Sequence, residues 1–277
     1  MANRALVVAF SILMQLSFNT ATDVNANIHY DVDNEIIEEQ QNNIVVPDSN
    51  DLIITVENSQ DNFKNEIEIE YVREIDPTKP MIAITYDDGP SKYTEELLNV
   101  LKENNSAATF FVLGVQVSKY EDAIIRMIEE GNQVGNHSYD HKKLTLLNDE
   151  ELYNQIDRTD NLIYDTAFYK PFVMRPPYGS IDEKLIKRVQ KPIINWSIDT
   201  RDWESRNTEA IVEIILENVK DGDIILMHDL YETSLEASKI VIPELIKRGY
   251  QLVTVSELSE QKDIILKVGQ SYYNLYK

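Results

Sequence analysis

The sequence predicts an α/β fold in which parallel strands alternate with helices. From residue 77 onward, short apolar runs rich in branched residues alternate with amphipathic stretches of helical period, and the connections are short. The runs expected as strands are 81–86, 108–113, 132–136, 171–175, 193–198, 223–228 and 250–255. The stretches expected as helices are 92–104, 118–130, 148–164, 181–190, 207–220 and 234–248. Strands separated by helices pair in parallel, and the pattern fits both an open sheet and a closed barrel.

Local signals support these boundaries. Asn148, followed three residues later by Glu151, has the pattern of a capping box, and Gly131 and Gly249 stand where helices commonly end. In a sheet of parallel strands, chemistry gathers at the carboxyl ends of the strands. The sequence therefore predicts functional residues at the strand ends.

Residues 1–26 have the pattern of a signal peptide. Arg4 precedes an apolar stretch at 5–18, and the small residues before and at Ala26 permit cleavage there. The apolar stretch falls short of the roughly 20 residues needed to span a bilayer. We therefore expect export to a secreted or cell-envelope location, with no stable membrane span after processing. The absence of cysteine fits an exported chain without disulfides.

Residues 27–76 form an acidic segment that we expect to be weakly ordered. They carry fourteen Asp or Glu residues against Lys64 and Arg73, in a chain with a formal net charge of −22. Ile67, Ile69 and Tyr71 alternate with acidic residues, which predicts a short edge strand. Nucleic acid is excluded as a partner, because binding it needs a basic surface.

Two neighbouring carboxylates end the first strand of the predicted sheet. Asp87 and Asp88 precede a Gly89-Pro90 turn, where the strand pleat gives way and both side chains can face one cavity. Two like charges that close require a cation or an arginine beside them. An Asp-Asp-Gly sequence alone is more often a solvated turn, so its interpretation depends on the other strand ends.

His137 and His141 follow the third predicted strand. On a helical turn, residues four apart share one face, so both imidazoles could reach one ion. With a carboxylate as third ligand they would form a site of the kind that binds hydrolytic and redox metals and leaves positions for water and substrate. Histidines at this spacing can also be a surface coincidence, but the acids at another strand end favour a metal site.

Three further strand ends carry polar or aromatic side chains. Arg175 precedes two prolines that fix an extended backbone, and it could pair with a carboxylate and keep that carboxylate ionised. Asp199, Asp202 and Trp203 follow the fifth strand, where the indole suits either core packing or a platform for a sugar ring. His228 ends the sixth strand, where a lone histidine is commonly a core group, but other candidate catalytic residues lie nearby.

These five motifs, in this order, resemble the NodB-type polysaccharide deacetylases, which are family four of the carbohydrate esterases. The resemblance runs from about Lys79 to Leu258 and includes the linking stretches 108–114 and 131–137. Tyr86 stands where phenylalanine is common in the family, and Asn132 where histidine is common. Neither departure removes a group that the chemistry needs, so the resemblance implies an active enzyme.

The resemblance implies a distorted (β/α)7 barrel, in agreement with the seven predicted strands. Together with the signal peptide at 1–26 and the acidic segment at 27–76, it gives predicted domain boundaries of 77–260 for the deacetylase domain and 261–277 for a C-terminal tail. It also implies a metal site made by Asp88, His137 and His141. The ion would be Zn²⁺, with Co²⁺, Ni²⁺ or Mn²⁺ as alternatives.

The remaining site residues also take their expected roles from the resemblance. Asp87 would be the general base, positioned by Arg175, and His228 the general acid. The backbone amide of Tyr178 would help to hold the oxyanion, and Leu226 would line the pocket for the acetyl methyl group. Asp199 or Asp202 would orient Arg175 or His228, and the sequence does not decide between them. The residues expected to contact the substrate are Tyr178, Trp203, Leu226 and Asp202.

The resemblance implies hydrolysis of N-acetyl groups on the amino sugars of a polysaccharide, with release of acetate. Peptidoglycan is the favoured substrate, because a secreted chain without cysteine or an appended binding module suits a bacterium's own envelope. The alternatives are a chitin or chitooligosaccharide deacetylase, an O-acetyl esterase of the xylan type, and an inactive glycan-binding or spore-coat protein. We expect a monomer.

Overall fold

The computed structural model describes residues 31–32, 35–36, 52–55, 68–71 and 73–277, and the chain divides into two compact units, 1–72 and 73–277. In the first unit, β1 (Asp31–Val32) pairs with β2 (Glu35–Ile36) and β3 (Leu52–Thr55) pairs with β4 (Glu68–Tyr71), both antiparallel. Strand β4 lies where the alternating pattern predicted a short strand. The predicted signal peptide lies outside the described residues.

A parallel sheet forms the centre of the second unit, as the sequence predicted. Its strands follow the order β7-β6-β5-β10-β9, and β11 pairs with the first residues of β5. The strands are β5 (Met81–Asp87), β6 (Thr109–Val112), β7 (Gln133–Asn136), β9 (Ile198–Asp199), β10 (Ile224–His228) and β11 (Gln251–Leu252). The first five residues of β5 are apolar or threonine and are buried, because Ile82 and Ile84 pack in the cluster shared with the helices while Met81 and Ala83 pack in a second cluster.

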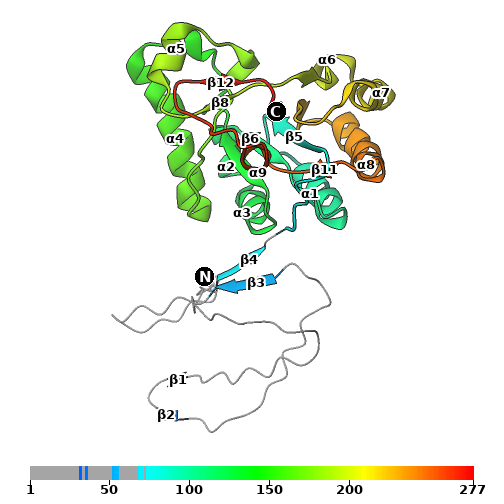
Figure 1. The fold of residues 1–277 in the computed structure, drawn as a ribbon. Coiled ribbons are helices and arrows are strands. Elements are labelled where there is room, and N and C mark those ends of the chain that lie inside the picture. Colours follow the sequence, from blue (N-terminus) through cyan, green and yellow to red (C-terminus); the bar gives the residue numbers. More distant parts are fainter. Residues whose placement is uncertain (1–30, 33–34, 37–51, 56–67, 72) are drawn as a thin grey trace. The chain divides into compact units, whose positions relative to one another are not determined.

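Helices surround the sheet in a continuous row (Figure 1). Neighbours in this row are α4, α3, α1, α8 and α7, each packed against the next. The longer helices are α1 (Thr94–Glu103), α3 (Glu121–Glu129), α4 (Asp149–Ala167), α7 (Thr208–Asn218) and α8 (Glu232–Lys247). The shorter ones are α2 (Gly114–Val117), α5 (Glu183–Arg188), α6 (Asp202–Ser205) and α9 (Val255–Gln261), and η1 (Leu144–Leu146) and η2 (Pro177–Gly179) are 3-10 turns.

The predicted helix ends are confirmed where a local signal specified them. The side chain of Asn148 accepts a hydrogen bond from the Glu151 N–H, and the Glu151 carboxylate accepts one from the Asn148 N–H, which completes the capping box of α4. Gly131 and Gly249 follow α3 and α8 with φ of 74° and 90°, a left-handed conformation that favours glycine.

The strand predicted at 171–175 is reduced to single bridges at Met174, one to Asn136 at the end of β7 and one to Ile193. Pro171 and Pro176 flank this residue and Pro192 precedes Ile193, and proline has no N–H to donate to a ladder. The sheet therefore does not close as a regular barrel. The pairing continues past Met174 only through β8 (Ile193–Ile194).

The strand predicted at 193–198 is divided into β8 and β9, because the chain changes its partner between them. The Asn195 N–H donates to the Tyr272 carbonyl at 2.7 Å, whereas the Ser197 N–H donates to the Ile224 carbonyl at 2.9 Å. The strand predicted at 250–255 is also shortened, because Thr254 caps the start of α9.

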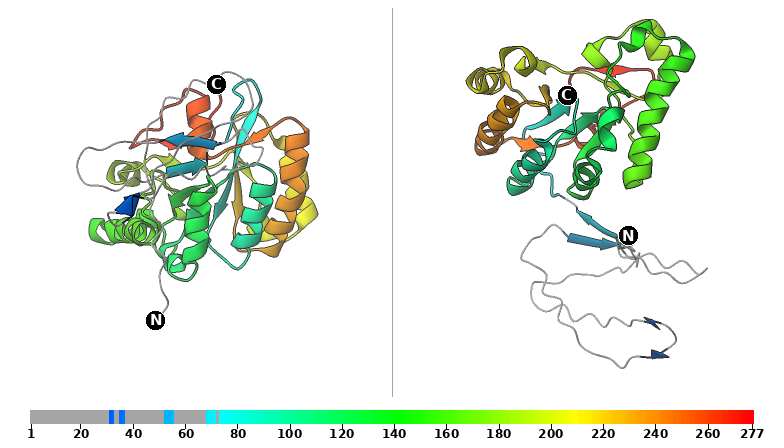
Figure 2. Two further views of the ribbon diagram at one scale, coloured as in Figure 1. Left: turned by 90° about the horizontal axis from the view of Figure 1, so that it is seen from below. Right: turned by 180° about the vertical axis from the view of Figure 1, so that it is seen from behind.

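Residues 261–277, predicted to be a tail, belong to the second compact unit. Strand β12 (Ser271–Tyr272) pairs in parallel with β8, and Asn274 bridges to Asp223 just before β10. In Figure 2, as in Figure 1, this segment runs along the part of the sheet that the helix row leaves uncovered. Residues 73–76, predicted to belong to the acidic segment, also lie in this unit, where buried Arg73 contacts Glu257.

No helix among the described residues combines the length and the apolar character needed to cross a membrane.

Leu275 tests whether the C-terminal segment is part of the core. Its side chain is 1% exposed and packs in the cluster that contains Met81 and Ile224. Replacing it with alanine should lower the free energy of unfolding by about 2–5 kcal/mol, as measured by urea denaturation. Ile265→Ala is the control, because Ile265 is 76% exposed. Equal, small effects of both substitutions would mean that residues 261–277 form a separable tail after all.

Candidate active site

A pocket of about 440 Å³ lies at the carboxyl ends of the central strands. It contains most of the side chains that the sequence predicted for the site. Its lining residues are Asp87, Asp88, His137, His141, Tyr178, Gly179, Trp196, Asp199, Trp203, Leu226, His228 and Tyr231.

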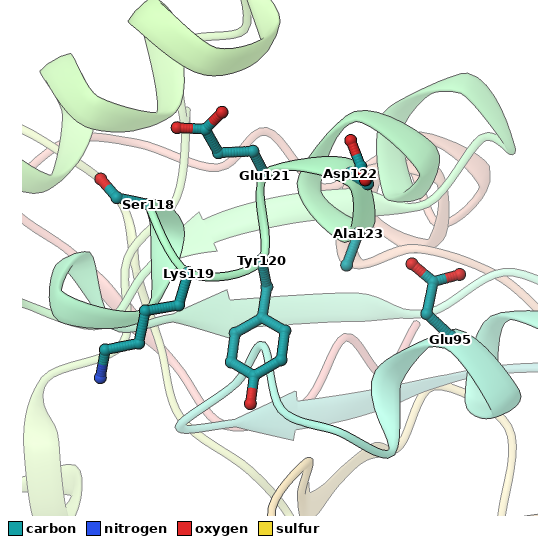
Figure 3. A pocket seen from close by; sticks show the side chains of 7 residues that line it. All are labelled: Glu95, Ser118, Lys119, Tyr120, Glu121, Asp122 and Ala123. Carbon is teal, nitrogen blue, oxygen red and sulfur yellow. The ribbon is translucent and has the colours of Figure 1, made fainter.

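A second hollow of about 340 Å³ lies beside the start of α3 (Figure 3). It is lined by Glu95 and by the run from Ser118 to Ala123. The side chains of Lys119, Tyr120 and Glu121 fan out in different directions in Figure 3. The first pocket, where charged and titratable groups converge, is therefore the candidate active site.

Asp87 is held by a buried arginine, as the sequence suggested. Nη1 of Arg175 donates to Asp87 Oδ1 at 2.7 Å and to Thr85 Oγ1 at 2.7 Å. The rest of the guanidinium donates to the carbonyls of Ile194 and Asn195, both at 2.9 Å. The Arg175 side chain is fully buried, so the paired charges and these hydrogen bonds replace its hydration.

Asp88, His137 and His141 bring one possible ligand atom each to within 4.8 Å of one another. Asp88 Oδ1 lies 3.4 Å from His137 Nε2 and 3.3 Å from His141 Nε2. This oxygen is buried and has no hydrogen-bond partner, which is unusual for a buried carboxylate. Burial alone would raise the pKa of Asp88, but the close approach of His137 and the positive charge that the surrounding histidines can carry outweigh it and lower the pKa to about 2.

His137 is oriented as metal-ligating histidines commonly are. The N–H at Nδ1 of His137 donates a hydrogen bond to the Arg175 carbonyl at 2.7 Å. The other ring nitrogen, Nε2, therefore carries the free lone pair, and it faces Asp88. Two imidazole nitrogens and one carboxylate oxygen, which is buried and unpartnered, fit a divalent cation of the zinc type. The three residues could hold such an ion.

The two histidines do not lie on a helical turn, and that expectation was wrong. Residues 137–141 form a bend after β7, in which Ser138 and His141 have left-handed φ values of 71° and 63°. Side chains replace the helical hydrogen bonds: Asn136 Oδ1 accepts from the Ser138 N–H at 2.8 Å, and Gln155 Oε1 accepts from the Tyr139 N–H at 2.9 Å. The bend still brings the two rings to a centroid distance of 5.1 Å.

The second carboxylate–histidine pair is Asp202 with His228. Their Oδ1 and Nδ1 atoms lie 2.7 Å apart, and Asp202 Oδ2 accepts hydrogen bonds from the His228 N–H and the Ser234 hydroxyl. Burial alone would lower the pKa of His228, but the hydrogen bond and the charge of Asp202 outweigh it and raise the pKa. His228 therefore tends to carry the proton that a general acid needs.

This geometry decides a choice that the sequence left open. Asp202 contacts His228, and neither Asp199 nor Asp202 forms an ion pair with Arg175. Asp199 lines the pocket, but its Oδ1 accepts from the Arg201 N–H. Asp202 was also predicted to contact the substrate, and the structure contradicts this, because its side chain is fully buried beneath His228.

The pocket rim is aromatic. Tyr178 and Trp203 are exposed and line the pocket, and Leu226 contributes a buried apolar wall, all where the sequence predicted them. Trp196 and Tyr231 also line the pocket, and neither was predicted from the sequence. Trp196 lies in a strand-like run and resembles core, but a Cβ on Gly179 would come within 2.6 Å of its ring, so the loop after Tyr178 packs directly on it. Tyr231 lies three residues after His228, and its proximity to a strand-end histidine was the available signal.

Comparison with known proteins gives a consistent family assignment. Residues 74–192 match the family model described as polysaccharide deacetylase. A peptidoglycan-N-acetylmuramic acid deacetylase of Bacillus subtilis is 43% identical over 68% of this chain and 40% of its own length. Its solved structure aligns with a TM-score of 0.67 and covers 68% of this chain and 94% of that chain.

Two further relatives are named for other substrates. A peptidoglycan-N-acetylglucosamine deacetylase of Listeria monocytogenes is 41% identical over 71% of this chain and 42% of its own length. A family 4 acetyl xylan esterase from Clostridium thermocellum, solved with a cobalt ion, is 30% identical, with a TM-score of 0.66 over 70% of this chain and 98% of that chain. The aligned region amounts to about two-fifths of the length of the two peptidoglycan deacetylases.

Asp202→Asn should lower the pKa of His228, because it removes the charge that opposes desolvation of the imidazolium. The pKa can be followed by NMR titration of the His228 ring protons in metal-free protein. Asp199→Asn is the matched control, since Asp199 bonds to the Arg201 N–H and not to His228. A pKa that falls equally in both variants would refute the pairing of His228 with Asp202.

Proposed function

This chain belongs to the polysaccharide deacetylase family, and we propose that its pocket hydrolyses N-acetyl groups on amino sugars of peptidoglycan, releasing acetate. The observation that carries the proposal is the convergence, in one pocket, of an arginine-paired carboxylate, an Asp-His-His set and a carboxylate-paired histidine. The relatives that match with 43% and 41% identity are peptidoglycan deacetylases by name, which supports this substrate.

The ion in this proposal is held by Asp88, His137 and His141. The family is metal-dependent, and we propose Zn²⁺ because two nitrogens and one oxygen suit it, with Co²⁺, Ni²⁺ and Mn²⁺ as alternatives. When bound, such an ion supplies Lewis-acid polarisation of the acetyl carbonyl and lowers the pKa of water.

Asp87 acts as the general base. Its Oδ1 is occupied by Arg175, and Oδ2 lies 3.7 Å from His137 Nε2, so the second oxygen faces the metal ligands. Asp87 takes a proton from water as the water oxygen attacks the acetyl carbon. The backbone amide of Tyr178 donates to the developing oxyanion, and a donor of this kind is typically worth about 3–4 kcal/mol.

His228 completes the reaction as the general acid. An amine anion is a poor leaving group, so the nitrogen must receive a proton as the C–N bond breaks. The raised pKa of His228 keeps that proton available, and Asp202 orients the ring so that Nε2 is free to donate it. The products are acetate and a free amino sugar.

The substrate proposal leaves two alternatives within the same pocket. The acetyl xylan esterase relative favours O-acetyl hydrolysis as the second candidate. Chitin or its oligosaccharides would present the same acetamido group. In each case the aromatic rim of Tyr178, Trp196, Trp203 and Tyr231 offers apolar faces for sugar rings.

The proposal includes action outside the cytoplasm, because peptidoglycan is an extracellular polymer. The support is the apolar stretch 5–18 behind Arg4 and the lack of cysteine. Fusing residues 1–26 to a reporter should direct it out of a bacterial cell, and retention in the cytoplasm would argue against export.

Substitution at the two neighbouring aspartates should separate the base from the ligand. Asp87→Asn should retain Zn²⁺ but lose at least about 10²-fold in turnover, because an amide cannot accept the proton. It should also destabilise the fold by about 3–5 kcal/mol, since Arg175 is left buried without its carboxylate. Asp88→Asn should weaken Zn²⁺ binding, measured as metal content after gel filtration. Equal metal loss in both variants would mean that the pair chelates as one unit.

Acetate release distinguishes the candidate substrates. The purified protein should release acetate from peptidoglycan faster than from acetylated xylan, should stop when a chelator removes the metal, and should recover when Zn²⁺ is restored. Mass spectrometry of the digested wall identifies the deacetylated sugar. Faster release from xylan would favour the esterase, and no release from any substrate by the Zn²⁺-loaded protein would favour an inactive glycan-binding protein.

A further inference from the structure

Asp229 is a buried carboxyl group to which the reaction above gives no role. It is almost fully buried, and within residues 73–277 it forms no ion pair with lysine, arginine or histidine. Burial raises its pKa to about 7, although the hydroxyls of Thr94 and Ser91 act against the rise. Burying a carboxyl group without a cation costs free energy, so its hydrogen bonds must compensate for that cost.

The hydrogen bonds of Asp229 all lead to the turn between β5 and α1. Its N–H donates to the Asp87 carbonyl at 2.9 Å. Its Oδ2 accepts from Thr94 Oγ1 at 2.5 Å, and Ser91 Oγ lies 3.4 Å from Oδ1. Thr94 Oγ1 in turn accepts from the Ser91 N–H at 2.7 Å. Asp229 thus binds both the start and the end of the segment 87–94.

The middle of that segment packs directly on the same carboxylate. A Cβ built on Gly89 would lie 2.5 Å from Asp229 Oδ2 and 3.0 Å from its Cβ. Any side chain at position 89 would push Asp229 and the turn apart. The backbone that follows Asp87 and Asp88 is therefore seated on Asp229 at close contact.

Asp229 also lies directly after the last residue pair between β10 and β5. The ladder between β10 and β5 ends with the pair His228 and Asp87. Asp229 is the next residue, and its N–H extends the hydrogen bonding by one step past the last pair. The residue that holds the turn is consequently the chain neighbour of the proposed general acid.

We propose that Asp229 is a positioning residue that fixes the 87–90 turn against the end of β10, and so sets the spacing between Asp87, Asp88 and His228. The proposal rests on the proposed deacetylase function for its kinetic consequences, but not for its effect on metal binding. Asp88 has a left-handed φ of 71°, a conformation that its surroundings must maintain. Catalytic groups must be held to within about half an ångström of their working geometry.

If Asp229 only stabilised the fold, its loss would lower the melting temperature without a specific effect on Zn²⁺ affinity or kcat. Asp223 provides the matched control for that case. Asp223 is equally buried, precedes the same strand β10 at its other end, and accepts hydrogen bonds from Ser197 Oγ at 2.8 Å and from the Lys220 N–H at 2.7 Å. Replacing either aspartate with alanine leaves hydroxyl or amide donors without their acceptor and should lower the melting temperature. Of these two aspartates, Asp229 contacts the turn that carries the base and the ligand, and Asp223 does not.

The experiment compares Asp229→Ala, Asp229→Asn and Asp223→Ala in the full chain. Zn²⁺ affinity of the metal-free protein is measured by competition with a chromophoric chelator, and kcat and KM are measured on an N-acetylated oligosaccharide. Asp229→Ala should lose about 10–100-fold in Zn²⁺ affinity and in kcat, the range typical of groups that orient metal ligands, with KM nearly unchanged. Asp229→Asn should recover much of both, because its amide oxygen still accepts from Thr94. Asp223→Ala should change the melting temperature alone.

Zn²⁺ affinity and kcat of Asp229→Ala equal to those of Asp223→Ala would overturn the proposal. If Asp229→Ala does not fold, Thr94→Val tests the same contact, since it removes the donor to Oδ2 at nearly constant volume. It should lower Zn²⁺ affinity several-fold, and an unchanged affinity would equally overturn the proposal. If the unsubstituted protein releases no acetate, the proposed function fails, and the Zn²⁺ affinities still decide the role of Asp229.

Discussion

The site depends on the buried contact between Arg175 and Asp87. The guanidinium joins the last residue of β5 to the backbone at and after β8, while the Arg175 carbonyl fixes the tautomer of His137. One residue therefore connects the proposed base, a proposed metal ligand and two strands that do not pair with each other. The backbone of Arg175 is itself held in place, because its N–H donates to the Asn136 carbonyl at 2.9 Å, beside the bridges that Met174 forms to Asn136 and Ile193.

Local patterns in the sequence predicted the helices, the central strands and most of the pocket lining. Apolar runs, caps and polar strand ends are encoded within a few residues, so periodicity alone finds them. The pairing of Asp202 with His228 could not be found in this way. It depends on Arg201, whose left-handed φ of 52° starts α6 and directs Asp202 inward while Asp199 stays at the pocket surface. Two acids three residues apart thus acquire different environments through one backbone reversal.

The C-terminal segment was misjudged for a related reason. Residues 261–277 follow the last predicted strand and lie beyond the stretch, about Lys79 to Leu258, that resembles the family, so they were predicted to be a tail. Their contribution is made by the backbone of β12 and by two buried leucines, Leu266 and Leu275. Backbone pairing leaves almost no trace in composition. The aromatic rim shows the same limitation, because Trp196 reads as core in sequence and becomes pocket lining only when the 178–179 loop folds over it.

The pairing of β12 with β8 has a consequence for the order of events during biosynthesis. Ser271 lies opposite Ile193. Strand β8 therefore cannot pair with β12 until the ribosome has added about 78 further residues. Until then β8 is an unprotected apolar edge, open to pairing with other chains. The last residues of the chain therefore protect this edge in addition to completing the core.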